Sequence, residues 1–418
     1  MPTAHAQRGL VTHKAASFLK AFPDSPFAGE ARALMRSAPT SPPASVSPVA
    51  RQRFLKVAVL CPTSRDAGKD LRDGALLAQT LMPTPNVDSL RVVFEDSDDD
   101  PVTSVRLVQA FAQDRDVVAI VGDLTSRTTV PAAAVANALQ TPMVTPTASE
   151  DGIASIGPCV FQINATPGAQ GRKIAAAAAE RGLRTFAILA ASDVYGKHMA
   201  EAFAGRVEAL GGKVVAREWY TPGTADFQAQ IQRIREVGMA MAGTAPSAGA
   251  VDTTGSEAAL PAPGIDGLLA AAQTPEDVIM TVSQMLTSPV AAHLLGGDGW
   301  NSPSVSREIG GVAQGVLFVS KYYEDPSDAA GRRFREAFRA RYGRAPNVAS
   351  ALGYDAMACV LRAIAEGGVS RETLRERLAA GQAFDGATGR VTLPPGERQN
   401  SGMYVLTIRD GKIVLADQ

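Results

Sequence analysis

Residues Val117–Ser149, VVAIVGDLTSRTTVPAAAVANALQTPMVTPTAS, decide the fold class of this chain. Two short apolar runs, Val117–Val121 and Pro142–Thr145, flank a segment that is long enough for one helix. Each run is typical of a buried strand in a parallel sheet, because such strands are apolar along their whole length. Strand, helix and strand in this order predict a parallel pair of strands joined by a crossover helix.

Small hydroxyl residues follow both predicted strands. They are Thr125, Ser126, Thr128 and Thr129 after the first, and Thr145, Thr147 and Ser149 at the end of the second. In α/β proteins ligands bind just beyond the carboxyl ends of the strands, and amides at a helix N-terminus attract anions. We therefore expect a small polar ligand here. For any single hydroxyl, a helix cap or a turn is the simpler explanation, and that alternative stays open for each residue.

Length, charge and cysteine content narrow the class of protein. With 418 residues the chain exceeds one ordinary core, so two or three compact units are expected. The 41 basic and 42 acidic residues nearly balance, and no basic stripe with interleaved aromatic residues occurs, which argues against a nucleic-acid partner. No apolar run approaches the roughly 20 residues that span a bilayer. The sequence predicts no metal and no cofactor, since its four histidines are scattered and its cysteines form no CxxC pair.

The cysteines, Cys61, Cys159 and Cys359, allow at most one disulfide, and we interpret them as small buried hydrophobic residues. The acidic run EDSDDD at residues 95–100 lacks the glycine and distal glutamate of an EF-hand loop. We expect Asp99 or Asp100 to cap a helix whose first residue is Pro101.

Three segments are predicted to lie outside the α/β units. Residues 1–36 read as a helix, a turn and a second helix, similar to the end of a tetratricopeptide repeat, which cannot bury its apolar face without neighbours. The chain would then be the downstream part of a longer protein; a loose amphipathic arm is the equal alternative. Residues 37–52 form a Pro/Ser linker, and residues 239–264, rich in small residues, are predicted to be a flexible surface insertion.

From residue 53 onward, predicted strands and helices alternate, and the alternation starts afresh at Pro167. This order predicts two α/β units, each a parallel sheet flanked by helices, with a cleft between them that favours a small ligand. Near the end, Asp410-Gly411 joins the apolar runs Met403–Ile408 and Lys412–Leu415, which is a strong hairpin signal.

Several phrases, taken in order, resemble one family. They are VGDLTSRTTVPAA, TPMVTPTAS, FQINATPGAQG, DVYGK, LLGGDGWNS, QGVLFVSKYY and ALGYDA. The resemblance is to the type I periplasmic solute-binding fold, in the branch of leucine/isoleucine/valine-binding proteins of ABC transporters, and covers about residues 53–418. It implies a two-lobed fold in which residues 53–163 and 321–392 form lobe 1. Residues 164–320 and 393–418 would form lobe 2.

The resemblance also implies a ligand site. Ser126 matches a serine that holds the α-carboxylate of an amino acid, and Ala148-Ser149 match an Ala-Thr pair that binds the carboxylate and amino groups. Tyr195 matches an aromatic residue that packs over the ligand, and Asp298 matches an acid that pairs with its ammonium. A carboxylate suits an ammonium and an aromatic ring supplies apolar cover, so the set is physically sensible.

The sequence departs from the family pattern in four places, one of which is the insertion at residues 239–264. Ala67 lies near a position where an aromatic residue is expected, and Gln273 replaces another, so the preference for the ligand's side chain does not carry over. Asp298 is shorter than the expected glutamate and reaches less far. For Tyr195 and Asp298, a surface aromatic residue and a turn residue are the plainer alternatives.

The resemblance implies a periplasmic or cell-envelope protein that closes around an amino acid, of the branched-chain type, or an amide, and delivers it to an ABC permease. LLGGDGWNSP and the N-terminal repeat also resemble penicillin-binding protein activators, which act on a peptidoglycan synthase; this is the second hypothesis. An enzyme is the third class. It has no support, because no GxSxG, HExxH or Walker A motif occurs.

Overall fold

The computed structural model describes Lys20, Gly29 and residues 54–84, 87, 89–224, 226–242, 264–287, 290, 292–324 and 328–417. The chain divides into two compact units, Met1–Gln52 and Arg53–Gln418. Apart from Lys20 and Gly29, the predicted helical extension and the linker lie outside the described residues, as does most of the predicted insertion 239–264.

The first sheet has five parallel strands in the order β2-β1-β3-β4-β5. These strands are β1 (Phe54–Cys61), β2 (Ser89–Asp96), β3 (Val117–Val121), β4 (Met143–Thr145) and β5 (Val160–Gln162). The helices between them are α3 (Asp66–Leu81), α4 (Pro101–Gln113) and α5 (Ser126–Ala138), and the short 3₁₀ turn η1 (Ile153–Ser155) precedes β5. The central strand β3 is buried at every residue, as its unbroken apolar run predicts.

The second sheet has seven strands in the order β14-β13-β10-β9-β8-β6-β7. They are β6 (Thr185–Ala191), β7 (Lys213–Tyr220), β8 (Gly267–Ala271), β9 (His293–Gly296), β10 (Leu317–Ser320), β13 (Tyr404–Arg409) and β14 (Lys412–Leu415). The sheet is parallel from β7 to β10, and the hairpin β13–β14 is added antiparallel to β10. The hairpin signal at Asp410-Gly411 is therefore confirmed, with both residues at positive φ.

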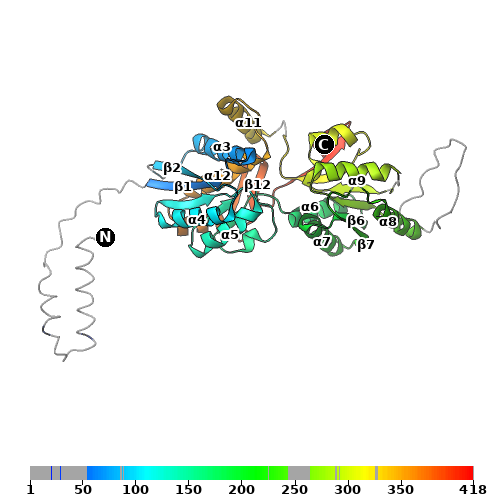
Figure 1. The fold of residues 1–418 in the computed structure, drawn as a ribbon, viewed down its shortest axis with the longest axis horizontal. Helices are drawn as coiled ribbons and strands as arrows, with labels where there is room; N and C mark the ends of the chain where they lie inside the picture. Colours follow the sequence, from blue (N-terminus) through cyan, green and yellow to red (C-terminus); the bar gives the residue numbers. More distant parts are fainter. Residues whose placement is uncertain are drawn as a thin grey trace, which may run out of the picture. The chain divides into compact units, whose positions relative to one another are not determined.

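Helix α6 (Pro167–Glu180) leads from β5 into the second sheet. The strands of that sheet are connected by α7 (Val194–Ala209), α8 (Gln228–Met241), α9 (Pro275–Thr287), the 3₁₀ turn η2 (Asp298–Trp300) and α10 (Pro303–Ile309). After β10 the chain returns to the first sheet, where it forms α11 (Ala329–Tyr342), α12 (Val348–Ala365), α13 (Arg371–Ala379), β11 (Gln382–Gly386) and β12 (Gly389–Leu393). The last two make a separate antiparallel pair. The second sheet is thus completed by strands β13 and β14 from a distant part of the chain, and the first sheet is covered by helices that follow β10 (Figure 1).

Helix α12 is the core helix of the first sheet. It packs side by side with α3, and both helices share one apolar cluster with β1 (Figure 1). Among the described residues α12 also has the length and hydropathy of a membrane span, but most of it is buried in this core.

Two sequence predictions are confirmed at the level of single residues. Asp100 caps α4, since its carboxylate accepts a hydrogen bond of 2.7 Å from the Thr103 amide and Pro101 is the first helical residue. All three cysteines are buried and unbridged.

Two glycines allow the close approach of α3 and α12. A β-carbon on Gly74 would overlap the carbonyl oxygen of Ser350, and one on Gly353 would overlap that of Leu71.

Gly74→Ala should therefore lower the free energy of unfolding by about 1–3 kcal/mol, the usual cost of overpacking, in a urea titration. The matched control is Gly205→Ala in α7, where a β-carbon meets open space. That change should be neutral or stabilise by up to about 1 kcal/mol. Equal effects of the two changes would contradict the close-packing explanation.

Candidate functional site

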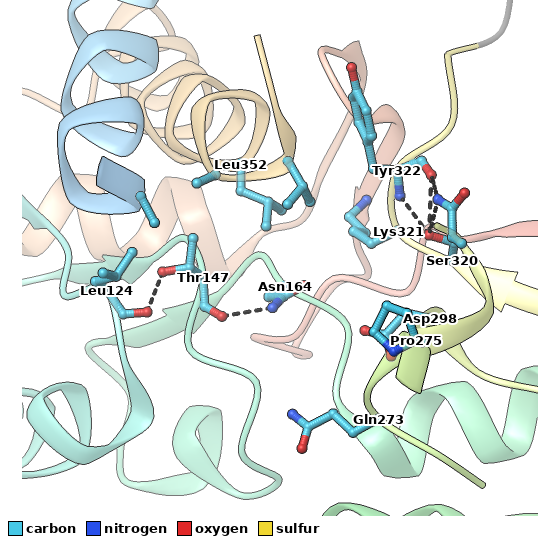
Figure 2. Close-up of a pocket in the computed structure, with 15 residues that line it drawn as sticks. Leu124, Thr147, Asn164, Gln273, Pro275, Asp298, Ser320, Lys321, Tyr322 and Leu352 are labelled. Atoms are coloured by element: carbon cyan, nitrogen blue, oxygen red, sulfur yellow. Dashed lines mark hydrogen bonds between the residues drawn. The ribbon is translucent and has the colours of Figure 1, made fainter. Parts of the chain in front are cut away.

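A cavity of about 450 Å³ lies at the carboxyl ends of strands from both sheets. Residues that follow β3, β4, β8, β9 and β10 supply its lining: Leu124, Thr147, Gln273, Asp298 and Lys321. In Figure 2, Leu124 and Thr147 lie on one side of the cavity, and Asp298, Ser320 and Gln273 lie on the other. This is the position at which open parallel sheets bind ligands.

The lining of this cavity combines apolar and polar side chains. Ala67, Leu124, Pro275, Val348, Ala349 and Leu352 are apolar, whereas Thr147, Asn164, Gln273, Asp298, Asn301, Ser320 and Lys321 carry polar groups. Such a mixture, with a few polar groups in an apolar wall, is typical of small-molecule sites.

A smaller cavity of about 190 Å³ lies beside it and shares Gln273 with it. Its lining is Ser126, Ser149, Glu150, Pro167, Val194, Tyr195, His198 and Gln273. Five of the six residues that the sequence predicts for the site therefore line one or both of the two cavities. The sixth, Ala148, is 1% exposed and packs in the core with residues of β3 and α5.

Ser126 joins the two hydroxyl clusters of the first sheet. Its Oγ accepts hydrogen bonds from the amides of Ser149 (3.2 Å) and Glu150 (3.1 Å). Ser126 is the first residue of α5, and the preceding Thr125 makes no side-chain cap. The amides at this helix start and the hydroxyl proton of Ser126 are thus placed to meet an anion.

The threonines near Ser126 bind backbone or one another. Thr147 Oγ1 donates to the Leu124 carbonyl at 2.5 Å, which ties the turn after β4 to the turn after β3. The hydroxyls of Thr125 and Thr128 lie 3.0 Å apart at the start of α5. Thr147 nevertheless also lines the larger cavity.

Tyr195 and Asp298 form one hydrogen-bonded unit. The Tyr195 hydroxyl donates to Asp298 Oδ1 at 2.8 Å and lies 3.0 Å from Gln170 Oε1, which accepts from the Asp298 amide at 3.0 Å. Burial raises the pKa of the Asp298 carboxyl and the pKa of the Tyr195 phenol. Asp298 also lines the larger cavity, where a carboxylate suits a cationic group.

Lys321 is the functional residue that sequence reasoning missed. It follows β10 directly, lines the larger cavity and is only 4% exposed. In the described part of the chain no atom accepts a hydrogen bond from its Nζ. Burial lowers its pKa to about 8, an effect that the charge of Asp355 opposes.

The segment that carries Lys321 is fixed by its neighbours. The side-chain Nδ2 of Asn301 donates to Ser320 Oγ (2.9 Å) and to the Tyr322 carbonyl. The backbone amide of Tyr322 donates to Ser320 Oγ (3.3 Å). Lys321 is therefore held at a defined place at the end of β10 (Figure 2). The phrase QGVLFVSKYY contains Lys321, and a single lysine directly after a buried apolar run is a usable signal.

Comparisons with known proteins show the family and the fold of this chain. The model of the family described as "Periplasmic binding protein" matches residues 62–412. A putative branched-chain amino acid ABC transporter protein from Rhodospirillum rubrum superposes with a TM-score of 0.74 at 24% identity, covering 87% of this chain and 99% of that chain. An ABC transporter substrate-binding protein from Desulfitobacterium hafniense in complex with Leu superposes with a TM-score of 0.64 at 21% identity, covering 87% of this chain and 99% of that chain.

A third similar structure has a different kind of ligand. The solute-binding protein of an ABC transporter from Rhodopseudomonas palustris, in complex with 3,4-dihydroxybenzoic acid, gives a TM-score of 0.61 at 18% identity, covering 86% of this chain and 95% of that chain. No curated protein sequence matches the chain. At these identities the structures show the fold, and the predicted two-lobed type I periplasmic-binding fold is confirmed. Because the family model matches most of its length, the chain belongs to the periplasmic binding protein family.

Proposed function

We propose that this protein is an extracytoplasmic solute-binding protein that closes around a small polar ligand, an amino acid or an amide, and delivers it to an ABC permease. The observation that carries the proposal is the pair of adjoining cavities at the strand ends of both sheets, lined by hydroxyl, amide and carboxylate groups. Membership of the periplasmic binding protein family supports the extracytoplasmic location.

Each predicted residue has a physical role in this proposal. Ser126 and the amides at the start of α5 bind the ligand's carboxylate, with Ser149 beside them. Asp298, oriented by Tyr195, accepts the ligand's ammonium, because a charged pair in a partly buried site is stronger than a neutral hydrogen bond. Gln273, which lines both cavities, contacts the ligand where they meet. Ala148 supports this wall from the core.

Binding couples to lobe closure. The larger cavity is lined from the strand ends of both sheets, so a ligand there contacts both at once and favours a closed form. A permease that recognises only the closed form would then receive loaded protein. The family and its similar structures are solute-binding proteins, and we propose no catalytic step.

Thermal-shift and calorimetric titration against amino acids and their amides tests the proposal. A ligand at about 100 times its Kd should add roughly 2.7 kcal/mol of stability. Asp298→Asn keeps an acceptor for Tyr195 but removes the charge, and should weaken binding about 10–100-fold. Ser126→Ala should weaken it by a similar factor.

Ser283→Ala is the matched control, since Ser283 is an exposed residue of α9. It should leave affinity unchanged. The proposal fails if no amino acid or amide stabilises the protein, or if the Ser126 and Asp298 variants bind as the wild type does. A protein that bound no solute but retained a peptidoglycan synthase on an affinity column would be a regulator instead.

A further inference from the structure

We propose that Lys321 binds a second carboxylate of the solute, so that the ligand is a dicarboxylic amino acid rather than a neutral one. This inference rests on the proposed solute-binding function and narrows it to one ligand class. It assigns a second anion-binding position, separate from the one that Ser126 provides.

The burial of Lys321 is the first argument. Its side chain is 4% exposed, lines the larger cavity and, within the described residues, finds no acceptor for its ammonium (Figure 2). Lysines are almost never buried without a partner, because an ammonium that leaves water loses its hydration. An anion that entered the cavity would supply the missing partner through a charge-assisted hydrogen bond.

Asp355 on α12 does not fill this role. Its Oδ1 accepts from the Ala387 amide at 2.6 Å, and its Oδ2 accepts from the amide and the hydroxyl of Thr388 at 3.0 and 2.5 Å. Its carboxylate is therefore used to fix the turn between β11 and β12. Asp355 acts on Lys321 through its charge, and that charge helps to keep the ammonium protonated at neutral pH.

The positions of the charged groups indicate the ligand class. Ser126 and the start of α5 favour an anion in the smaller cavity, Asp298 favours a cation in the larger one, and Lys321 favours an anion there. Acid, amine and acid in this order describe an amino acid with a carboxylate on its side chain. Leu124 and Leu352, in the same lining, would contact the methylene carbons between the charged ends.

Calorimetric titration of the full chain with L-glutamate, L-glutamine, L-leucine and glutarate tests the inference. We expect L-glutamate to bind at least about 10-fold more tightly than L-glutamine, because the neutral amide leaves Lys321 without an anion. Lys321→Met should weaken L-glutamate binding about 10–100-fold and remove the preference over L-glutamine. Lys321→Arg, which keeps the charge, should restore a preference for the acid. Lys69→Met, at an exposed lysine of α3, is the control and should change nothing.

The outcomes separate this inference from the function on which it rests. Tight binding of L-leucine or L-glutamine that Lys321→Met does not weaken would overturn the role of Lys321 and leave the solute-binding function standing. No binding of L-glutamate would overturn the inference, whereas the solute-binding function fails only if no amino acid or amide binds. Glutarate binding as tightly as L-glutamate would support Lys321 as the carboxylate anchor and contradict the dicarboxylic amino acid as the ligand class. Circular dichroism of each variant verifies that it is folded.

Discussion

Replacing Asp355 with alanine is expected to lower the free energy of unfolding by about 3–5 kcal/mol, the typical cost of breaking a buried charge network. The Asp355 side chain is fully buried, and its oxygens accept three hydrogen bonds from Ala387 and Thr388. The change would leave two buried amides without acceptors. It would also remove the negative charge that opposes the loss of the Lys321 proton.

Urea or thermal unfolding measures the effect of Asp355→Ala. Asp385→Ala is the matched control, because Asp385 is an exposed residue of β11 whose ion pair with Arg390 lies at the surface. It should cost no more than about 1 kcal/mol. Adding Lys321→Met to Asp355→Ala should recover part of the loss, since no unbalanced ammonium then remains. A loss below 1 kcal/mol for Asp355→Ala alone, or strictly additive effects in the double variant, would contradict the charge interaction.

The affinity for a dicarboxylate should fall as pH rises through about 8, the pKa to which burial lowers Lys321. Below this pH the free protein already carries the ammonium that the carboxylate needs. Above this pH the Lys321 ammonium of the free protein has lost a proton. Binding the carboxylate then requires uptake of that proton, so affinity falls by up to about tenfold per pH unit. Glutarate is the suitable probe, because its own carboxyls are ionised throughout this range.

Titrations with glutarate between pH 6.5 and about 9.5 measure this dependence. Three ionisable groups lie near Lys321: Asp355 on α12, Asp298 in η2 and the adjacent Tyr322. Burial raises the pKa of each of these groups. If one of them were responsible, the pH dependence would persist in Lys321→Met. We expect Lys321→Met to bind glutarate weakly, with an affinity that does not fall as pH rises. An affinity that still fell with pH in this variant would disprove the assignment of the pH dependence to Lys321.

The long helices were predictable from sequence because local signals suffice for them. Helices α11 and α12 carry strong local patterns: an aromatic stripe of Phe334, Phe338 and Tyr342 marks the first, and a long segment of mostly small apolar residues marks the second. The short elements α10, α13, β11 and β12 were not predicted. Helix α13, for example, buries only Leu374 and Leu378, and such a short pattern carries little periodicity.

The site was predictable as a place but not as a set of contacts. Strand ends followed by hydroxyls indicated where a ligand binds, and five of the six predicted residues line a cavity there. Whether a residue reaches the smaller or the larger cavity depends on packing between segments far apart in sequence, as the bond from Tyr195 to Asp298 illustrates. Lys321 was missed for a local reason, because the apolar run Val316–Val319 before it and Tyr322 after it are typical of a strand rather than of a site.

The late addition of β13 to the second sheet and of α12 to the first has a consequence for synthesis on the ribosome. Strand β10 lies between β9 and β13, yet β13 begins only at Tyr404. The five strands of the first sheet are complete by Gln162, but the helix α12 that covers their apolar face is made almost two hundred residues later. Until β13 and α12 have been made, a nascent chain therefore exposes an open strand edge and a sheet face that α3 covers only in part. Chaperones that hold unfolded chains would have to protect it during that interval.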